Sequence, residues 1–465
     1  MTDASGKRQI HFSLLSMPTL AHNDYGIWRH PESQKLRFDD PAFWAEIARL
    51  CEESKMDALF LADGLGITDS FGGSFDVSLR EGMHVPVIDP GLVAASVASV
   101  TAHLGLAVTA ASTFDPPFSH ARRMATLDHL TKGRAGWNVV TGFIKNAEDN
   151  YGVPPASSSA ERYDTTEEFM DVAYKLWEGS WEDDAVVADR ESGVYIDPDK
   201  VHRIDHVGEH YRSSGPALWH PSPQRTPVIF QAGMSERGRL FAAKHAEVVF
   251  TASGSEPDTY KALIADLRAK AASFGRRRED MKLLSVAAIV TGEDDEAARA
   301  KLATYEKWTR PEGYLAHVNA LNGFNPLVHD RSETLIDALR TDGFKRDDFS
   351  AYIPSPDITV GDYMDIFKAV GNMPGTFVGS PVKVADQLEE YLAEYDLDGF
   401  LLRSFLYPNS LRDFRDYIVP ELQRRGVYRT EYEGTTLREN VFGVGQKRIS
   451  ERHHASSFRL APISA

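Results

Sequence analysis

Cysteine is almost absent from this sequence, with Cys51 the single one among 465 residues. One thiol cannot form an intrachain disulfide, and a cysteine-based metal site is excluded as well. Cys51 lies in the stretch AEIARLCEESK, where the apolar residues have helical spacing. We therefore expect it to be a core or boundary residue.

Long hydrophobic runs and an excess of positive charge are also absent. No apolar run is long enough to cross a bilayer, and residues 1–12 lack the apolar core of a signal peptide. The formal net charge is −17 and the pI is about 5.4. Because a polyanion repels phosphate groups, neither nucleic acid nor a membrane surface is expected as a partner. We expect a cytoplasmic protein.

Short apolar segments alternate with helical patterns about eight times along the chain. Gly133 is expected to adopt the left-handed conformation that ends a helix just before one of these segments. The alternation predicts the α/β class and a (β/α)8 TIM barrel. A doubly wound sheet is the alternative, but no GxGxxG turn follows the first strand. The expected strands are residues 9–16, 56–61, 104–113, 134–141, 226–232, 247–251, 281–290 and 399–402.

Three long segments interrupt this alternation, at about residues 64–90, 178–225 and 309–376. The apolar content of 178–225 is too thin for a core of its own, so we interpret the segments as insertions in βα loops of one domain spanning residues 1–465. Loops of this length in a compact domain are usually functional. The tail, 445–465, has no periodicity and is expected either to wrap a partner subunit or to be loose.

Polar residues that closely follow the expected strands are the candidates for chemistry, because TIM-barrel sites lie at the carboxyl ends of the strands. This set comprises His22, Asp63, Thr113, Asn138, Tyr163, the run 232–235 and Arg403.

The stretch GMSERG (residues 233–238) has the clearest physical interpretation. Gly233 permits a tight turn after a strand, and Ser235 occupies the position of a helix N-cap. The free N–H groups and the dipole of such a helix end suit a phosphate group, although a plain serine cap is the alternative.

The remaining candidates are open to structural interpretations. Asn138 lies on a buried strand, so a neighbouring strand or a ligand must satisfy its amide. A carboxylate such as Asp63 can also simply cap a loop. His22, His84 and His317 lie in separate segments without HExxH or paired spacing, so the sequence predicts no metal site.

Several sequence motifs resemble those of a known protein family. The stretch ARRMATLDHLTKGRAGWNVVTG (residues 121–142) resembles bacterial-luciferase-like flavin monooxygenases, in the branch of long-chain alkane, dimethylsulfide, dibenzothiophene-sulfone and nitrilotriacetate monooxygenases. Other similar stretches cover nearly the whole chain. They include GIWRHPESQ (26–34), FLADGLG (60–66), VPVIDP (85–90), YKLWEGSWEDDAV (174–186), PSPQRTPVIFQAGMSERGR (221–239) and VPELQRRGVYR (419–429).

The resemblance implies a two-component monooxygenase. A separate NAD(P)H:flavin reductase would supply FMN as FMNH2, and O2 would form a C4a-(hydro)peroxyflavin that oxidises a small organic substrate. It places the FMN phosphate near Tyr163 and the run Gly233, Met234 and Ser235. It places Asp63, Thr113 and Asn138 near the flavin ring or ribityl chain. His22, His84 and His317 would lie on the substrate side as proton donors or hydroperoxide stabilisers.

Departures from the alkane enzyme fall where the substrate would bind. Thr19 stands in place of a cysteine, Thr68 of a tyrosine, His84 of a glutamine and Phe143 of a histidine. We expect these changes to alter the substrate pocket while keeping the flavin site, so the alkane substrate is not carried over.

Three other functions fit the same resemblance. They are a flavin-degrading oxygenase of the riboflavin lyase type, a deazaflavin-dependent hydride-transfer oxidoreductase, and a flavin-binding protein without turnover. The resemblance also implies a homodimer or homotetramer.

Overall fold

Eight parallel strands close into a barrel in the computed structural model, which describes residues 8–69, 71, 73–142, 144–153, 158–252, 257–343 and 357–460. Each of the eight strands expected from the sequence is present, and the predicted TIM barrel is confirmed. The pairing of β9 with β8 closes the barrel, in the register Val248↔Lys282. The strands are β1 (His11–Ser16), β2 (Ala58–Leu61), β3 (Gly105–Ala111), β4 (Ala135–Val140), β7 (Val228–Gln231), β8 (Val248–Thr251), β9 (Lys282–Thr291) and β11 (Gly399–Arg403).

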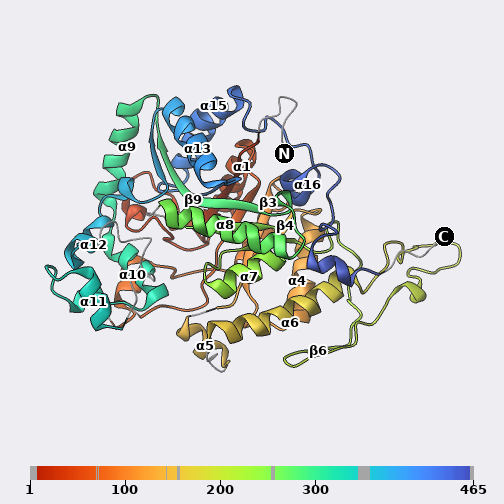
Figure 1. Ribbon diagram of the computed structural model, residues 1–465. Helices are drawn as coiled ribbons and strands as arrows, with labels where there is room; N and C mark the ends of the chain where they lie inside the picture. Colours follow the sequence, from red (N-terminus) through yellow and green to blue (C-terminus); the bar gives the residue numbers. More distant parts are fainter. Residues whose placement is uncertain are drawn as a thin grey trace.

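Helices surround this barrel (Figure 1). The helix expected before β4 ends as predicted, because Gly133 has φ 88° and the strand begins at Ala135. The helices of the ring are α1 (Pro41–Glu53), α3 (Pro90–Val97), α4 (Pro117–Leu130), α6 (Ser159–Glu178), α7 (Glu236–His245), α8 (Pro257–Ser273), α9 (Asp295–Trp308), α13 (Pro381–Tyr395), α14 (Asn409–Asp413) and α15 (Val419–Arg424).

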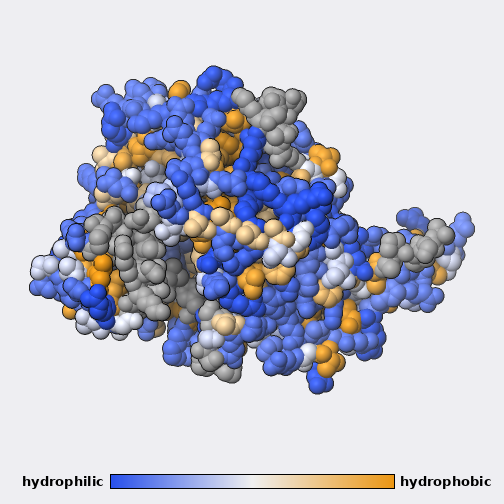
Figure 2. All heavy atoms as spheres, viewed as in Figure 1, coloured by the Kyte–Doolittle hydropathy of each residue, from blue (hydrophilic) through white to orange (hydrophobic). Residues whose placement is uncertain are grey.

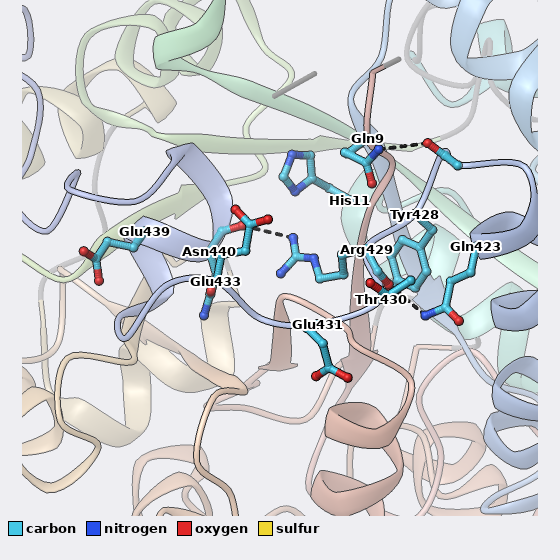
Figure 3. A pocket seen from close by; sticks show the side chains of 11 residues that line it. Gln9, His11, Gln423, Tyr428, Arg429, Thr430, Glu431, Glu433, Glu439 and Asn440 are labelled. Atoms are coloured by element: carbon cyan, nitrogen blue, oxygen red, sulfur yellow. Dashed lines mark hydrogen bonds between the residues drawn. The ribbon is translucent and has the colours of Figure 1, made fainter. Parts of the chain in front are cut away.

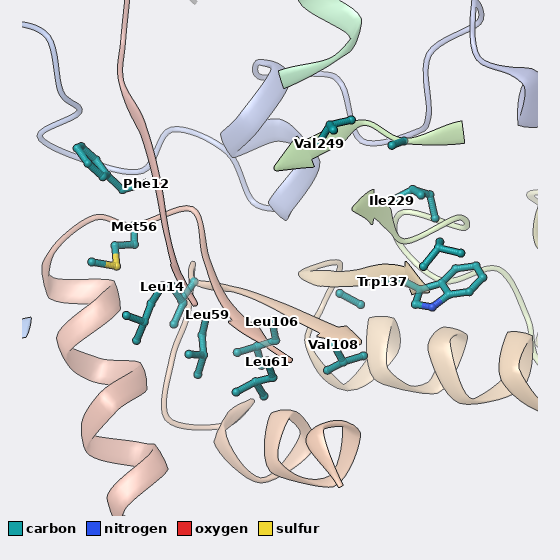
Figure 4. Packing of buried hydrophobic residues seen from close by; sticks show 14 of the residues in the cluster. Phe12, Leu14, Met56, Leu59, Leu61, Leu106, Val108, Trp137, Ile229 and Val249 are labelled. Carbon is teal, nitrogen blue, oxygen red and sulfur yellow. The ribbon is translucent and has the colours of Figure 1, made fainter. Parts of the chain in front are cut away.

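The main core lies between the strands and this ring. Successive strand residues point to opposite faces, so Leu59 and Leu61 of β2 pack toward the helices while Phe60 between them points into the barrel. Figure 4 shows the outward side chains, among them Leu14, Leu59 and Trp137, packed against the helices. Full burial of each such side chain stabilises the fold by about 1.5–3 kcal/mol.

A short helix, α16 (Leu437–Phe442), closes the amino-terminal end of the barrel. Leu437 packs among the inward-facing strand residues, and a side chain at Gly105 would collide with it. The neighbouring Arg438 is buried and donates to Glu247 from Nε at 2.7 Å. The Arg438–Glu247 ion pair and the apolar packing of Leu437 therefore both hold α16 in place.

The insertion at 309–376 is more regular than its sequence suggested. Its described residues form α10 (Pro311–Asn322), α11 (Leu335–Thr341) and α12 (Val360–Ile366), and these contribute to a second hydrophobic cluster with Tyr25 and Ile27. A ninth strand, β10 (Thr376–Gly379), begins at its end and pairs in parallel with the distal half of β9. The sequence pattern predicted neither this strand nor this cluster.

The other two insertions are mainly irregular. Before α3 begins at Pro90, the described positions of the first insertion contain one α-helix, α2 (Asp76–Glu81). A separate helix, α5 (Lys145–Tyr151), follows β4. The 178–225 segment contains a two-stranded hairpin, β5 (His206–Val207) with β6 (Arg212–Ser213), and extends from the body of the molecule at the right of Figure 1.

The tail packs against its own chain over the described positions 445–460. Ile449 is buried, His453 Nε2 lies 2.8 Å from the His245 carbonyl oxygen, and Arg459 pairs with Glu178 at 3.1 Å. These contacts exclude the loose arrangement for this part of the tail.

The face seen in Figure 2 is largely hydrophilic, with hydrophobic residues in separate patches. Among the described helices, none has the length and apolar content needed to traverse a bilayer.

Candidate active site

A cavity of about 370 Å³ opens at the carboxyl ends of the barrel strands. That is the end where TIM-barrel enzymes carry their chemistry, and its volume lies within the usual range for a small-molecule site. Its walls come from the ends of β2, β3, β4 and β7 and from α5 and α6. The lining residues are Asp63, Gly64, Leu65, Thr109, Ala111, Phe114, Val139, Val140, Thr141, Gly142, Ile144, Ala147, Tyr163, Gln231, Ala232 and Gly233.

A second pocket, of about 280 Å³, lies at the opposite end of the barrel, beside α16. Figure 3 shows Arg429 extending toward Asn440, whose carbonyl oxygen it reaches at 3.0 Å. His11 Nδ1 lies 3.0 Å from Asp57 Oδ2, and Arg429 also pairs with Asp57. These polar groups tie the strand starts to the C-terminal segment, so we assign this end to stability rather than chemistry.

The cavity at the carboxyl ends of the strands has the features of an anion site at one end. A Cβ atom at Gly233 would collide with the Tyr163 hydroxyl and with the Gln231 amide, so glycine keeps this corner open. Gly238, in the first turn of α7, packs against Gly233. Ser235 is the N-cap of α7, and its Oγ accepts from the Gly238 N–H at 3.1 Å. The amino-terminal end of α7 therefore borders the cavity.

Cationic side chains surround the same corner. The Arg237 guanidinium lies 5.9 Å from the centroid of the Tyr163 ring. Arg162 Nε is buried and has no hydrogen-bond partner in the described part of the chain. Burial raises the pKa of the Tyr163 phenol, against the hydrogen bond from Gln231 and the charges of Arg237 and Arg162, so it remains a neutral O–H donor. Arg162 was not among the residues predicted from the sequence, although it adjoins Tyr163.

The barrel mouth presents acceptor atoms that lack donors. Asn138 Nδ2 donates to Thr109 Oγ1 at 2.9 Å, which leaves Asn138 Oδ1 buried without a partner among the described residues. Gln231 Oε1 is likewise buried without a partner among the described residues, while Gln231 Nε2 donates to Tyr163 Oη at 3.2 Å. Buried acceptors of this kind ordinarily have a partner, so a ligand with hydroxyl or amide donors fits here. Gln231 and Thr109 were not predicted from the sequence; each is marked there only as a polar residue in an apolar strand.

Asp63 lines the cavity directly, as expected from its position after β2. Its Oδ1 accepts from the Gly64 N–H at 2.9 Å. Burial raises the pKa of this carboxyl to about 7, with a further contribution from Asp89. Asp63 can therefore hold or release a proton near neutral pH.

The other predicted cofactor residues act less directly. Thr113 does not line the cavity; its Oγ1 donates to the carbonyl oxygen of the lining residue Thr141 at 2.6 Å. Met234 packs against the main core, and Ser235 uses its hydroxyl as the helix cap. None of these three residues belongs to the cavity lining.

The three predicted histidines come together although they are far apart in sequence. The ring centroid of His84 lies 4.6 Å from that of His317 and 5.1 Å from that of His22. The cluster adjoins the cavity, because a Cβ atom at the lining residue Gly64 would be 3.9 Å from His84 Cβ.

Tyr25, which was not predicted from the sequence, joins two of these rings. Its hydroxyl lies 3.2 Å from His84 Nε2 and 2.9 Å from His317 Nδ1. It is fully buried, and burial raises its pKa well above the usual value, so it remains a phenol. No local motif marks it, since both contacts are long-range.

The cluster is electrostatically neutral at pH 7. Burial lowers the pKa of His317 to about 4 and places those of His22 and His84 well below 6.5. The peptide N–H of His22 donates to Asp24 Oδ1 at 2.6 Å, and burial raises the pKa of Asp24 to about 6.

Two of the expected substrate-pocket residues, Thr19 and Thr68, lie outside the cavity lining. Thr19 is buried and its Oγ1 donates to the Pro86 carbonyl at 2.7 Å. Thr68 is also buried, and its carbonyl accepts from Ser78 Oγ at 2.8 Å. Phe143 lies outside the described residues. Arg403, at the end of β11, donates to Thr376 Oγ1 at 3.0 Å.

Comparison with known proteins settles the family. Residues 19–395 match the family described as luciferase-like monooxygenase. The chain belongs to this family. The sequence-based expectation is confirmed, and the luciferase-like fold accounts for a site built at the carboxyl ends of eight parallel strands.

Individual relatives are similar over almost their whole length. The long-chain alkane monooxygenase of Geobacillus thermodenitrificans is 42% identical over 453 residues, covering 97% of this chain and 98% of that protein. The dimethyl-sulfide monooxygenase of Hyphomicrobium sulfonivorans is 40% identical over 459 residues, covering 98% and 95%. The crystal structure of riboflavin lyase with modified FMN and substrate riboflavin has a TM-score of 0.88 at 37% identity, covering 98% of this chain and 100% of that one.

Proposed function

We propose that this luciferase-like protein is the oxygenase component of a two-component, FMN-dependent monooxygenase. A separate NAD(P)H:flavin reductase supplies FMNH2, and O2 is the co-substrate for oxidation of a small organic molecule. The observation that carries the proposal is the cavity at the strand ends, which has an anion-binding corner at one side and the histidine cluster close to the other. We further propose that the working form is a homodimer or homotetramer.

The phosphate of FMN fits the corner at Gly233. The Tyr163 hydroxyl donates a hydrogen bond, Arg162 supplies positive charge with an unused N–H, and the start of α7 contributes backbone N–H groups. The open space at Gly233 lets the phosphate approach the backbone closely.

The rest of the flavin fits the barrel mouth. The unsatisfied oxygens of Asn138 and Gln231 can accept hydrogen bonds from ribityl hydroxyls. Asp63 lies at the ring end, and Thr113 fixes the loop after β4 through Thr141. Met234 and Ser235 hold the turn that presents Gly233.

Reduced FMN, when bound, supplies the electrons that activate O2 for transfer of one oxygen atom to the substrate. The chain orients the ring and excludes water from it, through the apolar lining contributed by β4 and α5. Asp63, with its pKa near 7, can deliver a proton at the edge of the cavity. His22, His84 and His317 are neutral and donate N–H hydrogen bonds on the substrate side.

The substrate is a small organic molecule. Thr19, Thr68, His84 and Phe143 differ from the residues of the alkane enzyme, which favours a polar or heteroaromatic substrate over an alkane. The riboflavin lyase neighbour makes riboflavin the first candidate of that kind to test. The deazaflavin-dependent and the non-catalytic alternatives are separated by the same experiment.

The test mixes the protein with photoreduced FMN and then with oxygenated buffer in a stopped-flow spectrometer. We expect tight binding of FMNH2, a transient absorbance distinct from reduced and oxidised flavin, and faster decay of that transient with a substrate such as riboflavin. Binding followed by featureless reoxidation, with no effect of any candidate substrate, would favour the non-catalytic alternative. Failure to bind FMNH2 would refute the proposal in favour of a deazaflavin.

A further inference from the structure

The cluster of His22, His84 and His317 has the composition of a metal site. Each residue offers one ring nitrogen, and the three nitrogens lie within 4.8 Å of one another. We propose that these three histidines bind a single first-row transition-metal dication, with Zn2+ as the reference ion. This inference does not depend on the flavin, and it departs from the sequence analysis, which predicted no metal site.

The donor set determines the class of ion. Three neutral imidazoles without a carboxylate favour Zn2+, Co2+, Ni2+ or Cu2+, and they disfavour Mg2+ and Ca2+, which take oxygen ligands. Tetrahedral Zn2+ with Zn–N bonds of about 2.0–2.1 Å requires nitrogens about 3.4 Å apart. Each imidazole therefore has to move by about an ångström, which side-chain rotation in a partly open cluster can provide. Water or another ligand would fill the fourth position.

The surroundings are those of a metal site rather than of a packed core. His22 Nδ1 is buried and lacks a hydrogen-bond partner anywhere in the described ranges, so its lone pair or proton is unused. Tyr25 holds His84 and His317 by one ring nitrogen each, which leaves each ring its other nitrogen for a metal. Metal-ligating histidines commonly have an oxygen partner of this kind.

The backbone supports the same conclusion. His84 has φ 57°, in the left-handed region that a side chain rarely occupies. Strain of this kind persists only where the surrounding structure imposes it, and it concentrates at functional sites.

The nearby charges are balanced. The buried Lys35 acts electrostatically on His22, and the carboxyl of Asp24 opposes Lys35. Lys35 Nζ donates to the Thr19 carbonyl at 3.3 Å and lies 4.6 Å from the centroid of the Tyr407 ring, so other groups hold its charge. A dication at the histidines would not meet an unopposed positive charge.

A bound dication would use the ring nitrogens that the monooxygenase reaction needs on the substrate side. Metal binding and hydrogen bonding to a substrate are therefore mutually exclusive at these rings. We expect a loaded site to reduce turnover, as a reversible inhibitor would.

The test uses chelator-treated, flavin-free protein, titrated with ZnCl2 by calorimetry and with CoCl2 by visible absorbance. We expect one equivalent to bind, with the intense d–d bands of nitrogen-ligated, four-coordinate Co2+. His22→Ala and His317→Ala should each weaken binding by roughly 100-fold or more, since each removes a ligand, and Tyr25→Phe by roughly 10–100-fold. His103→Ala, an exposed histidine stacked on Tyr432, is the matched control and should bind as the parent does.

No stoichiometric binding to the parent would overturn the proposal, and so would equal affinity in the parent and in both ligand variants. Circular dichroism of each variant shows whether a loss of binding reflects a loss of fold; if one ligand variant is misfolded, the other and Tyr25→Phe decide. Because neither flavin nor O2 is present, this outcome is independent of the monooxygenase test.

Discussion

The buried histidine His120 offers a quantitative test of how this fold responds to acid. It lies on α4 with 1% of its surface exposed, and its ring centroid is 4.1 Å from that of Trp137 and 5.5 Å from that of Phe169. Both ring nitrogens are buried, and neither has a hydrogen-bond partner among the residues that the structure describes. Burial, with a smaller contribution from Arg123, lowers the pKa of this imidazole to about 3.

The sign and size of the effect follow from this shift. Below pH 6.5 the unfolded chain binds a proton at this position, but the folded chain does not until about pH 3. Stability is therefore lost as the pH falls from 6.5, by about 1.4 kcal/mol for each pH unit, until protonation of the folded state ends the loss near pH 3. His120→Leu, a change of similar volume, removes this dependence, so its advantage over the parent should grow by about 1.4 kcal/mol between pH 7.5 and pH 5.5.

The variant also removes two unsatisfied polar atoms, which should stabilise the folded state by about 1–3 kcal/mol at either pH. The loss of the aromatic contacts of the imidazole should destabilise it by about 0.5–1.5 kcal/mol. Urea unfolding of parent and variant at both pH values measures the difference, in which all other titrating groups cancel. His103→Leu, on the surface, controls for the loss of an imidazole as such. A constant gap between parent and His120→Leu would refute the reasoning, because it would mean that His120 has a hydrogen-bond partner in the folded state.

Three other predictions test the cofactor corner, the barrel closure and the ring end of the cavity. Gly233→Ala should weaken FMN binding by roughly tenfold or more, because the new methyl group collides with Tyr163 and Gln231, and the same collision should cost about 1–3 kcal/mol of stability; unchanged affinity in a flavin titration would contradict the phosphate assignment. Arg438→Met should cost about 3–5 kcal/mol in urea unfolding, since it leaves Glu247 buried without its partner, whereas Lys145→Met at an exposed pair should change little. Asp63→Asn should gain stability relative to the parent as the pH rises from 3.8 to about 7, and gain no more above that, because in this window the unfolded carboxyl ionises while burial keeps the folded one protonated; a gap that does not change across this window would argue against the burial of this group.

The sequence by itself determined the barrel and several of the residues that line its cavity. The apolar periodicity of each strand and helix is local, so it predicted all eight strands, and Gly133 ended α4 where expected. Asp63, Tyr163 and Gly233 line the cavity because residues that follow parallel strands meet at one end of a barrel. The recurring family motifs identified the same positions.

The tertiary structure decided everything that depends on contacts between distant segments. His22 and His84 lie on loops and His317 lies on α10, more than sixty residues apart at the closest, and only the packing of the insertion at 309–376 brings them together around Tyr25. Contacts between distant segments also decide that α16 closes the barrel and that β10 joins the sheet. They likewise leave the side-chain oxygens of Asn138 and Gln231 buried without a hydrogen-bond donor among the described residues. Side-chain periodicity indicates which face of an element is buried, but it does not indicate which distant segment packs against that face. The chemistry of this site depends on side chains from such distant segments, so only the tertiary structure could show it.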